Sequence, residues 1–325
     1  MNDSPAVRRR GVAFARVLLA LGVAVAVVAV TVVLTRSTDA DPAGSTVPAA
    51  RPMPAPAPAT SANAVPAPRQ GLAAAAVAAA EAASGDVGFA PGPPAGAPVG
   101  STIAVLDRRT SEVAVGQGGT AGVLSASLSK LVLAVDMVDR RRTEGLPITD
   151  VDTDLVRRAL GPSDDAAMSA LWSRFDGPGA APRISARLGL TGVASPRDPS
   201  QWGEMVVTAS DLLHVWKHVL DELPAADQEL LIGAMAAAPA RATDGFDQAF
   251  GLLAPGLPVE VGAAKQGWMC CIRGQNQLHS VGVVGPDDRF VMAVLATTPT
   301  AATARQLVDR MVAAASGALS PPTAG

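Results

Sequence analysis

The segment SASLSKLVLAVDM, residues 125–137, begins an apolar helix with a serine and a lysine three residues apart. The chain holds 26 Lys and Arg residues, and only three of them are lysines. An arginine would solvate a helix end equally well, but arginine stays charged, whereas the pKa of a lysine can be shifted until the amine loses its proton. We therefore expect the amine of Lys130 to exchange a proton with a neighbouring group, and Ser127 is within its reach.

Ser127 and Lys130 share one helical face, because Cβ atoms three residues apart on a helix are about 5 to 6 Å from each other. A neutral amine at that distance can take the hydroxyl proton and make Ser127 a nucleophile. Serine is also a common cap at helix starts, and S-x-x-K arises by chance about once in a few hundred residues. The pair alone does not decide between a catalytic site and a capped helix.

Two further motifs follow along the chain. The stretch GPSDDAAMSALW, residues 161–172, places Ser163 before two aspartates in a region of helical pattern. The stretch VGAAKQGWM, residues 261–269, places a triplet that begins at Lys265 on a predicted strand. Lys130 and Lys265, two of the three lysines, thus belong to these serine and lysine motifs. Solvation of the protein surface does not explain why the lysines are placed there.

With these motifs the sequence resembles the penicillin-recognising serine hydrolases, the superfamily of serine β-lactamases and cell-wall DD-peptidases, whose motifs are S-x-x-K, S-D-N and K-T-G. The resemblance covers about residues 71–318 and preserves the order and spacing of the motifs. It is strongest to the class A type, and among those to Ala-rich, β-lactamase-like envelope proteins of actinobacteria. It implies serine chemistry without a cofactor or metal, acting on a peptidoglycan peptide or a β-lactam.

The resemblance implies a role for each motif residue. Ser127 is the expected acylated nucleophile, and Lys130 is its expected base. Ser163 is expected to relay the proton to the leaving group. Lys265 is expected to raise the local positive potential, to hold the substrate carboxylate, and to keep Lys130 deprotonated through like-charge repulsion.

The strand of the third motif is expected to form one wall of the substrate site. Gly267 would let substrate lie against this strand, because a side chain there would block the edge. The backbone N–H groups of Ser127 and Trp268 are the expected oxyanion hole, where they would stabilise a developing tetrahedral oxygen.

Several departures from the superfamily pattern bear on turnover. Asp165 stands where the family has Asn, and a carboxylate near Lys130 favours the charged form of that amine. Gln266 replaces a hydroxyl residue that contacts the substrate carboxylate, although its amide can still donate. Trp268 is bulky where small residues are usual. The E-x-x-x-N pattern that carries the deacylating Glu of class A enzymes is missing, and Glu204, the nearest carboxylate, lies at an unmatched position.

Two functions are compatible with these residues. One is a serine hydrolase or transpeptidase that forms an acyl-enzyme at Ser127 with penicillins or D-Ala-D-Ala wall peptides and releases it slowly. The other is a catalytically degenerate member of the fold that acts as a wall-peptide-binding or interaction domain. The choice depends on whether Asp165 and Gln266 are tolerated variants or lesions.

The folded part of the chain is expected to be one α+β domain over residues 71–318. In order, it contains a helix, two strands, a mostly helical insert, three strands and a final helix capped by Thr300. The first helix is predicted at 71–85, the insert at 127–240, and the strands at 101–109, 111–119, 259–272, 278–285 and 289–299. This order predicts an antiparallel five-stranded sheet with both terminal helices on one face, plus an all-helical insert.

The first 37 residues resemble a membrane signal. Several arginines precede the uncharged run VLLALGVAVAVVAVTVVL, residues 17–34, which at about 1.5 Å per residue is long enough for a thin bilayer core. The positive flank predicts that the rest of the chain is exported. We expect an uncleaved single-pass anchor, with a cleaved secretory signal as the alternative. A lipid anchor is excluded because no cysteine lies near this run.

The remaining segments carry no predicted chemistry. The Pro/Ala-rich stretch at 38–70 cannot build a core and is expected to be an extended linker, and 319–325 are expected to be a disordered tail. The net charge of −3 gives no indication of a nucleic-acid partner. The sequence leaves the oligomeric state open.

Weaker candidates lie outside the motifs. His214 and His218 are four residues apart on a predicted helix and could in principle bind a metal, but the pattern favours a solvated face. Cys270 and Cys271 are adjacent on a strand, which favours buried thiols or a vicinal disulfide over a catalytic thiol. Arg273 could supplement carboxylate binding, although a turn arginine is the simpler interpretation.

Overall fold

The computed structural model describes residues 71–85 and 100–320 of the chain. The predicted anchor at 17–34 and the predicted linker at 38–70 lie outside the described residues. Within the part that is described, no helix is both long enough and apolar enough to cross a membrane.

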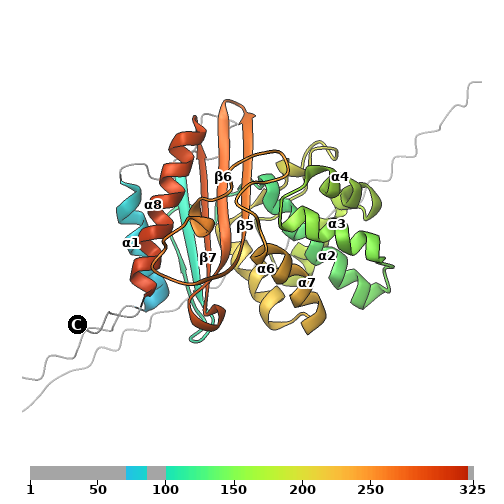
Figure 1. Cartoon of the computed structure of the whole chain (residues 1–325), viewed down its shortest axis with the longest axis horizontal. Helices are drawn as coiled ribbons and strands as arrows, with labels where there is room; N and C mark the ends of the chain where they lie inside the picture. Colours follow the sequence, from blue (N-terminus) through green and yellow to red (C-terminus); the bar gives the residue numbers. More distant parts are fainter. Residues whose placement is uncertain (1–70, 86–99, 321–325) are drawn as a thin grey trace, which may run out of the picture. The chain divides into compact units, whose positions relative to one another are not determined.

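A five-stranded antiparallel sheet forms the centre of the domain, in the order β2-β1-β7-β6-β5 (Figure 1). The strands are β1 Gly100–Asp107, β2 Glu112–Val115, β5 Val261–Ile272, β6 Gln275–Val284 and β7 Phe290–Thr298. The C-terminal strand β7 pairs with β1 along the whole length of β1, so the two ends of the domain meet in the middle of the sheet. Strand β5 lies at one edge. The predicted α+β class and its sheet are confirmed.

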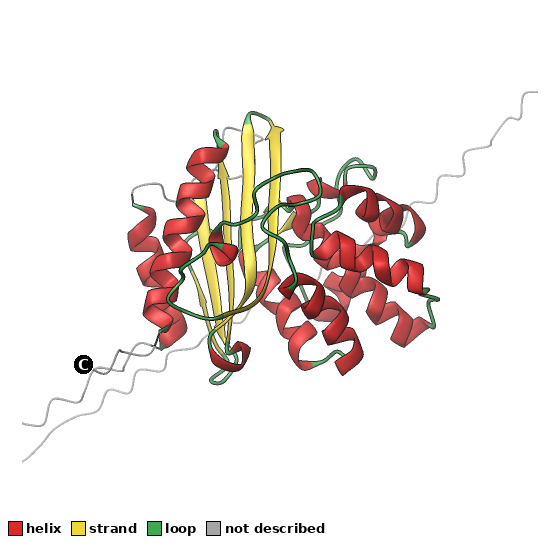
Figure 2. Cartoon of the chain, in the orientation of Figure 1, coloured by secondary structure: helices red, strands yellow, loops and turns green. Residues whose placement is uncertain are grey.

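The central strands are buried on both faces. In β7, Val291 and Ala293 pack toward the helical insert, whereas Met292 packs toward α1 (Leu72–Ser84) and α8 (Ala301–Leu319). This two-sided burial explains why the sequence of β7 is continuously apolar instead of alternating. Helices α1 and α8 lie side by side on one face of the sheet, and the other helices lie beyond its opposite face (Figure 2). The predicted placement of the terminal helices is therefore confirmed.

The insert is helical, with one addition that the sequence did not predict. It contains α2 Ser129–Glu144, α3 Asp150–Leu160, α4 Asp165–Arg174, α5 Ala180–Leu188, α6 Ala209–Asp221 and α7 Ala225–Ala236. Helix α2 is its central helix, because every residue from 129 to 139 is buried. The addition is a small sheet of β3 (Val123–Leu124) and β4 (Val206–Val207). Two residues per strand are too few to show an alternating pattern.

The prediction that His218 lies on a solvated face is wrong. Its side chain is 3% exposed, and its ring nitrogens lie 2.9 Å from Asp139 Oδ2 and 2.8 Å from Glu222 Oε2. Hydrogen bonding to Asp139, together with the contact to Glu222, raises the pKa of His218. Asp139 comes from α2, 79 residues away, so no pattern within α6 could indicate this burial. His214 is exposed, as predicted.

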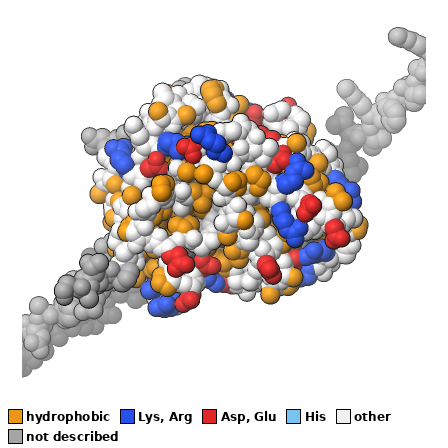
Figure 3. Space-filling model, in the orientation of Figure 1, with side chains coloured by type: hydrophobic (Ala, Val, Ile, Leu, Met, Phe, Trp, Pro, Cys, Tyr) orange, Lys and Arg blue, Asp and Glu red, His pale blue; other side chains and the backbone are white. Residues whose placement is uncertain are grey.

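The ends of the domain differ slightly from prediction. Thr300 caps α8 by accepting a hydrogen bond from the Thr303 N–H at 3.1 Å, as predicted. Leu319, assigned from the sequence to the tail, is the last helical residue and is buried. On the surface, basic and acidic side chains are mixed over the face shown in Figure 3, so that face presents no basic stripe.

Candidate active site

Ser127 lies in a short 3-10 turn, η1 (Ala126–Leu128), directly before α2. Ala126 has a left-handed φ of 48°, which turns the chain sharply just before the serine. His279 of β6 holds the chain three residues before Ser127, because its Nε2–H donates to the Leu124 carbonyl at 2.8 Å. Burial lowers the pKa of His279 to about 4, so the imidazole is neutral. The sequence analysis missed His279, since a single histidine on an apolar strand gives no signal.

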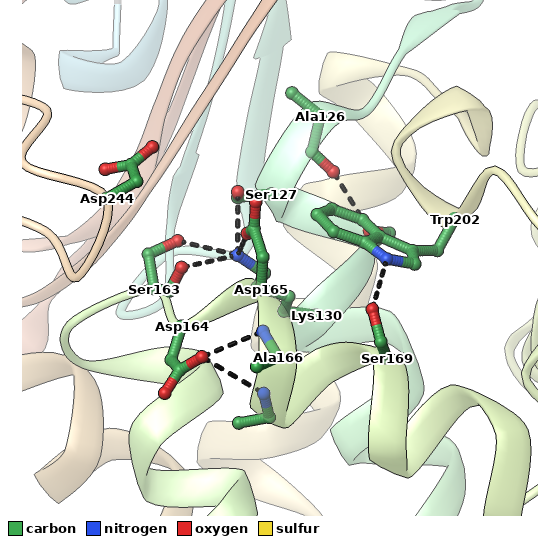
Figure 4. Close-up of polar contacts among 12 residues, drawn as sticks. Ala126, Ser127, Lys130, Ser163, Asp164, Asp165, Ala166, Ser169, Trp202 and Asp244 are labelled. Atoms are coloured by element: carbon green, nitrogen blue, oxygen red, sulfur yellow. Dashed lines mark hydrogen bonds and ion pairs between the residues drawn. The ribbon is translucent and has the colours of Figure 1, made fainter.

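The amine of Lys130 is the centre of the site (Figure 4). Its Nζ atom lies 3.0 Å from Ser127 Oγ, 3.0 Å from Ser163 Oγ, 2.7 Å from the Ser163 carbonyl and 2.7 Å from Asp165 Oδ1. An ammonium has three hydrogens to donate, and four acceptors surround this one. A neutral amine would instead accept the hydrogen of Ser127. The structure thus brings the first two motifs together around the amine of Lys130.

Two opposing effects act on the pKa of Lys130. Burial lowers it, the carboxylate of Asp165 raises it, and the net direction is downward. The predicted ion pair with Asp165 is present, but burial outweighs its effect, so the pKa of Lys130 is lowered and not raised. The reason is exposure: the side chain of Lys130 is 0% exposed and that of Asp165 is 60% exposed, so water screens the carboxylate far more than the amine.

Ser163 lies between the two buried lysines. Its Oγ is 3.0 Å from Lys130 Nζ and 2.9 Å from Lys265 Nζ, and its backbone is left-handed with a φ of 56°. Lys265 is 1% exposed, and its amine also donates to the Gln266 carbonyl at 2.8 Å. Burial lowers the pKa of Lys265 well below its usual range, and the positive charge of Lys130 adds to this effect. In the structure the amine of Lys265 holds Ser163 and is closed off from solvent, and its contact with a substrate carboxylate stays a prediction.

Asp164, the second residue of this motif, has a structural role. Its carboxylate caps α4 by accepting from the N–H groups of Ala166 at 2.8 Å and Ala167 at 3.1 Å. It also forms an ion pair with Arg158. This cap sets the start of α4, whose first residue is Asp165, so that Asp165 reaches Lys130.

Gln266, whose amide is predicted to bind substrate, does not face solvent in the structure. Its side chain is 1% exposed, and Nε2 donates to the carbonyls of Phe250 and Gln248. Successive residues of a strand point to opposite faces. Because Lys265 points toward Ser163, Gln266 points toward the layer that contains Phe250.

Gly267 makes a close packing contact that the sequence did not predict. A Cβ atom there would meet the Ser125 carbonyl at 3.0 Å and Leu128 Cγ at 3.2 Å. These atoms belong to the turn around Ser127 and not to a substrate channel. The missing side chain therefore lets β5 pack directly against the turn that carries Ser127.

A cleft of about 400 Å³ opens beside Ser127. Of the other predicted residues, Asp165, Glu204 and Trp268 also line it. Trp202 and Asp244 line it as well, and the sequence analysis missed both. Trp202 follows no motif, and Asp244 lies in a loop without periodicity, so only the fold brings them to the site.

Two indoles and a carboxylate shape this cleft. The ring centroid of Trp202 is 4.9 Å from Lys130 Nζ, and Trp202 and Asp244 lie on opposite sides of that amine (Figure 4). Trp268 stacks on Phe246 with ring centroids 4.6 Å apart, and its Nε1 donates to Asp244 Oδ2 at 3.0 Å. These contacts hold the indole of Trp268 in place at the cleft wall.

The remaining candidates have no catalytic arrangement. Cys270 and Cys271 form a disulfide and are exposed, so the alternative of buried thiols is wrong, and Cys270 lines the cleft. Arg273 lies in the turn after β5 and is not among the residues that line the cleft. Over residues 71–85 and 100–320, no group of three or more His, Cys, Asp or Glu side chains is placed to hold a metal ion.

The fold matches that of known serine β-lactamases. A class A β-lactamase from Mycobacterium abscessus is similar with a TM-score of 0.56 and 18% identity, over 75% of this chain and 99% of that chain. A β-lactamase from Chitinophaga pinensis is similar with a TM-score of 0.57 and 15% identity, over 68% of this chain and 94% of that chain. The domain therefore has the fold of the penicillin-recognising serine hydrolases.

No family model matches the chain. A mycobacterial protein shares more of its sequence: LppW of Mycobacterium tuberculosis, named as a candidate lipoprotein, is 34% identical over 245 residues, which are 71% of this chain and 77% of LppW. The Mycobacterium bovis protein of the same name matches equally. The chain belongs to the LppW family.

Proposed function

We propose that this protein is an exported, membrane-anchored serine hydrolase that forms an acyl-enzyme at Ser127 with penicillins or D-Ala-D-Ala wall peptides and releases it slowly. The observation that carries the proposal is the 3.0 Å contact between Ser127 Oγ and Lys130 Nζ. Burial lowers the pKa of this amine, which favours the neutral form that a general base requires.

Acylation would use the residues around this amine. Lys130 takes the hydroxyl proton as Ser127 Oγ attacks the carbonyl carbon of the substrate. Ser163 lies between Lys130 and Lys265 and relays the proton to the leaving group. The backbone N–H groups of Ser127 and Trp268 are proposed to stabilise the tetrahedral oxygen.

Slow release follows from what surrounds the acyl-serine. Hydrolysis needs a positioned water and a base for its proton, and losing an efficient base typically costs about 10²- to 10⁴-fold. The indole of Trp202 lies over Lys130, where it limits the access of water to the amine. Glu204 lines the cleft but does not match the deacylating Glu of class A enzymes.

Covalent labelling with a fluorescent penicillin tests this function, with Ser127→Ala as the matched control. We expect a slowly formed, persistent single adduct on the peptide that contains Ser127, seen by intact-protein mass spectrometry. Rapid steady-state hydrolysis of a chromogenic cephalosporin would contradict slow release. Absence of an adduct under all conditions would contradict acylation.

A non-catalytic wall-peptide-binding role is the second candidate. It is favoured by the burial of Lys265 and Gln266, because both side chains donate their hydrogen bonds to other groups of the protein. Wall-peptide binding that is equal in the wild type and in Ser127→Ala, without any adduct, would support this role.

A location in the cell envelope is proposed from the anchor-like run at 17–34 and from the name of LppW. In this proposal the apolar run at 17–34 holds the chain at the membrane. Protease shaving of spheroplasts should release a fragment that begins in the 38–70 linker. Protection of the domain until lysis would contradict this topology, and a secreted fragment in the medium would indicate signal cleavage.

A further inference from the structure

The cleft beside Ser127 is lined by carboxylates. Asp165, Glu204 and Asp244 all contribute to its walls, and none of the lining residues in the described part of the chain is a lysine or an arginine. Asp165 is 60% exposed at its side chain but is ion-paired with Lys130, so Glu204 and Asp244 supply the acidic groups of the cleft that this ion pair does not include. A ligand that enters this cleft therefore meets acidic groups.

The two lysines of the site offer no free positive charge to a ligand, because Lys130 is ion-paired with Asp165 and both amines are buried. Lys130 and Lys265 are each 1% exposed, and neither lines the cleft. Their hydrogens are directed at groups of the protein itself, namely the two serines, Asp165 and the Gln266 carbonyl. An incoming carboxylate would find no free cationic donor here, and it would lie close to acidic groups.

The two indoles define the rest of the site. Trp202 and Trp268 form apolar parts of the walls, and Asp244 binds the indole N–H of Trp268, so carboxylate and ring edge lie next to each other. An apolar body that ends in a positive charge matches this pairing of indole and carboxylate. The cleft volume of about 400 Å³ suits a short acyl group of this kind.

We propose that the cleft at Ser127 selects acyl donors that carry a positively charged ammonium group on an apolar body, in preference to donors that carry a carboxylate. This proposal names the substrate class of the site, and it therefore rests on the proposed acylation of Ser127. It also predicts slow reaction with penicillins, which carry a carboxylate. In the acylation step Ser127 Oγ bonds to the acyl carbon, its proton passes to Lys130, and the bond between the acyl carbon and the leaving oxygen breaks with its electron pair on that oxygen.

Matched p-nitrophenyl esters test the proposal through acylation. Three esters of equal chain length end in a trimethylammonium group, in its neutral tert-butyl isostere, or in a carboxylate, and the burst of p-nitrophenolate gives the acylation rate. We expect the cationic ester to react at least about fivefold faster than the isostere, the size of one charge contact in a half-open cleft, and the carboxylate ester to react slowest. Equal rates, or a faster carboxylate ester, would overturn the proposal.

Two variants show whether the preference for the cationic ester comes from the carboxylates of the cleft or from the overall negative charge of the protein. The double variant Glu204→Gln, Asp244→Asn should reduce the ratio of cationic to neutral rates to about one. The control Glu229→Gln removes a carboxylate on exposed α7, away from the cleft, and should leave the ratio unchanged. A ratio that falls equally in both variants would overturn the assignment to this cleft.

Binding to Ser127→Ala distinguishes failure of this proposal from failure of the proposed function. The amide analogues of the three esters are not acyl donors for this variant, and calorimetry measures their affinities. Binding of the cationic amide at least about fivefold more tightly than the neutral one supports the ligand class even if no ester acylates the wild type. Equal affinities, or a tighter carboxylate amide, overturn the ligand class even if penicillin labels Ser127.

Discussion

Asp165 Oδ1 lies 2.7 Å from Lys130 Nζ, so the acid that replaces the asparagine of the S-D-N motif is ion-paired with the candidate base. The pair is unequal, because the amine is buried and the carboxylate is largely exposed. Its effect on the reaction is therefore open to direct measurement by changing the exposed partner alone.

Asp165→Asn should speed the acylation of Ser127. Asp165 raises the pKa of Lys130 against the effect of burial, so removing the charge lowers this pKa further and increases the neutral fraction of the amine. We expect a gain of about fivefold, since an ion pair with one exposed partner is worth about 1 kcal/mol. The pH at which acylation reaches half its maximal rate should also move downward. The acylation rate and its pH dependence are measured by labelling with a fluorescent penicillin, stopped at successive times. Asp154→Asn, at an exposed aspartate, is the control. An unchanged or slower rate in Asp165→Asn would contradict the prediction.

Trp202→Ala should shorten the lifetime of the acyl-enzyme. The indole lies over Lys130, and its removal admits water to the amine that has to act as the base. We expect release about tenfold faster, a part of the 10²- to 10⁴-fold that a working general base supplies. Time-resolved intact-protein mass spectrometry follows the loss of the adduct. Trp202→Phe, which keeps an aromatic cover, should retain a long lifetime, and equal lifetimes in all three proteins would refute a shielding role.

Gly267→Ala should slow acylation while the domain still folds. The added Cβ meets the Ser125 carbonyl at 3.0 Å and Leu128 at 3.2 Å, so β5 and the turn around Ser127 have to move apart. Misplacing reacting groups by about 1 Å can cost about 10²-fold, and we expect at least about tenfold here. The control is Gly233→Ala on α7, where a Cβ meets nothing within 4 Å. The rate of penicillin labelling is measured in both variants, and circular dichroism confirms that each is folded. A wild-type rate in Gly267→Ala would show that acylation does not need this close contact.

The buried pair of His218 and Asp139 predicts a pH dependence of stability. The pKa of His218 is raised in the folded state, so its contribution is fully present below the unfolded value of about 6.5 and is lost as the pH rises through the folded value. Although burial raises the pKa of Asp139, hydrogen bonds from His218, Arg187 and Arg142 lower it to about 2. Its contribution is therefore present above about 4 and is lost as the pH falls toward about 2.

Urea unfolding over a range of pH checks this prediction. His218→Gln should lower the free energy of unfolding by about 1.5 to 3 kcal/mol near pH 6, the value of a hydrogen bond to a charged group. The variant should also lack the loss of stability that the wild type shows on the alkaline side. His214→Gln, at the exposed histidine of the same helix, should leave the curve unchanged. The same alkaline loss in His218→Gln would assign it to another group.

Much of the fold could be read from local patterns. Continuous apolar strands, a polar turn between β6 and β7, and Thr300 before an amphipathic run each report a local preference of the backbone, and each was found as predicted. The β3–β4 pair and the burial of His218 were not predictable, because both depend on partners about 80 residues away in the chain.

For the candidate site, too, some features could be predicted from the sequence and others could not. The spacing of Ser127 and Lys130 on one turn was enough to predict that the amine reaches the hydroxyl, since three residues on a helix span a known distance, and the 3.0 Å contact confirms it. The direction in which Gln266 points, the closure of Lys265 from solvent, and the arrival of Trp202 and Asp244 at the cleft came only with the tertiary structure. Burial and long-range contacts set the charge of a group and its access to a ligand, and neither is a property of the residue's own segment.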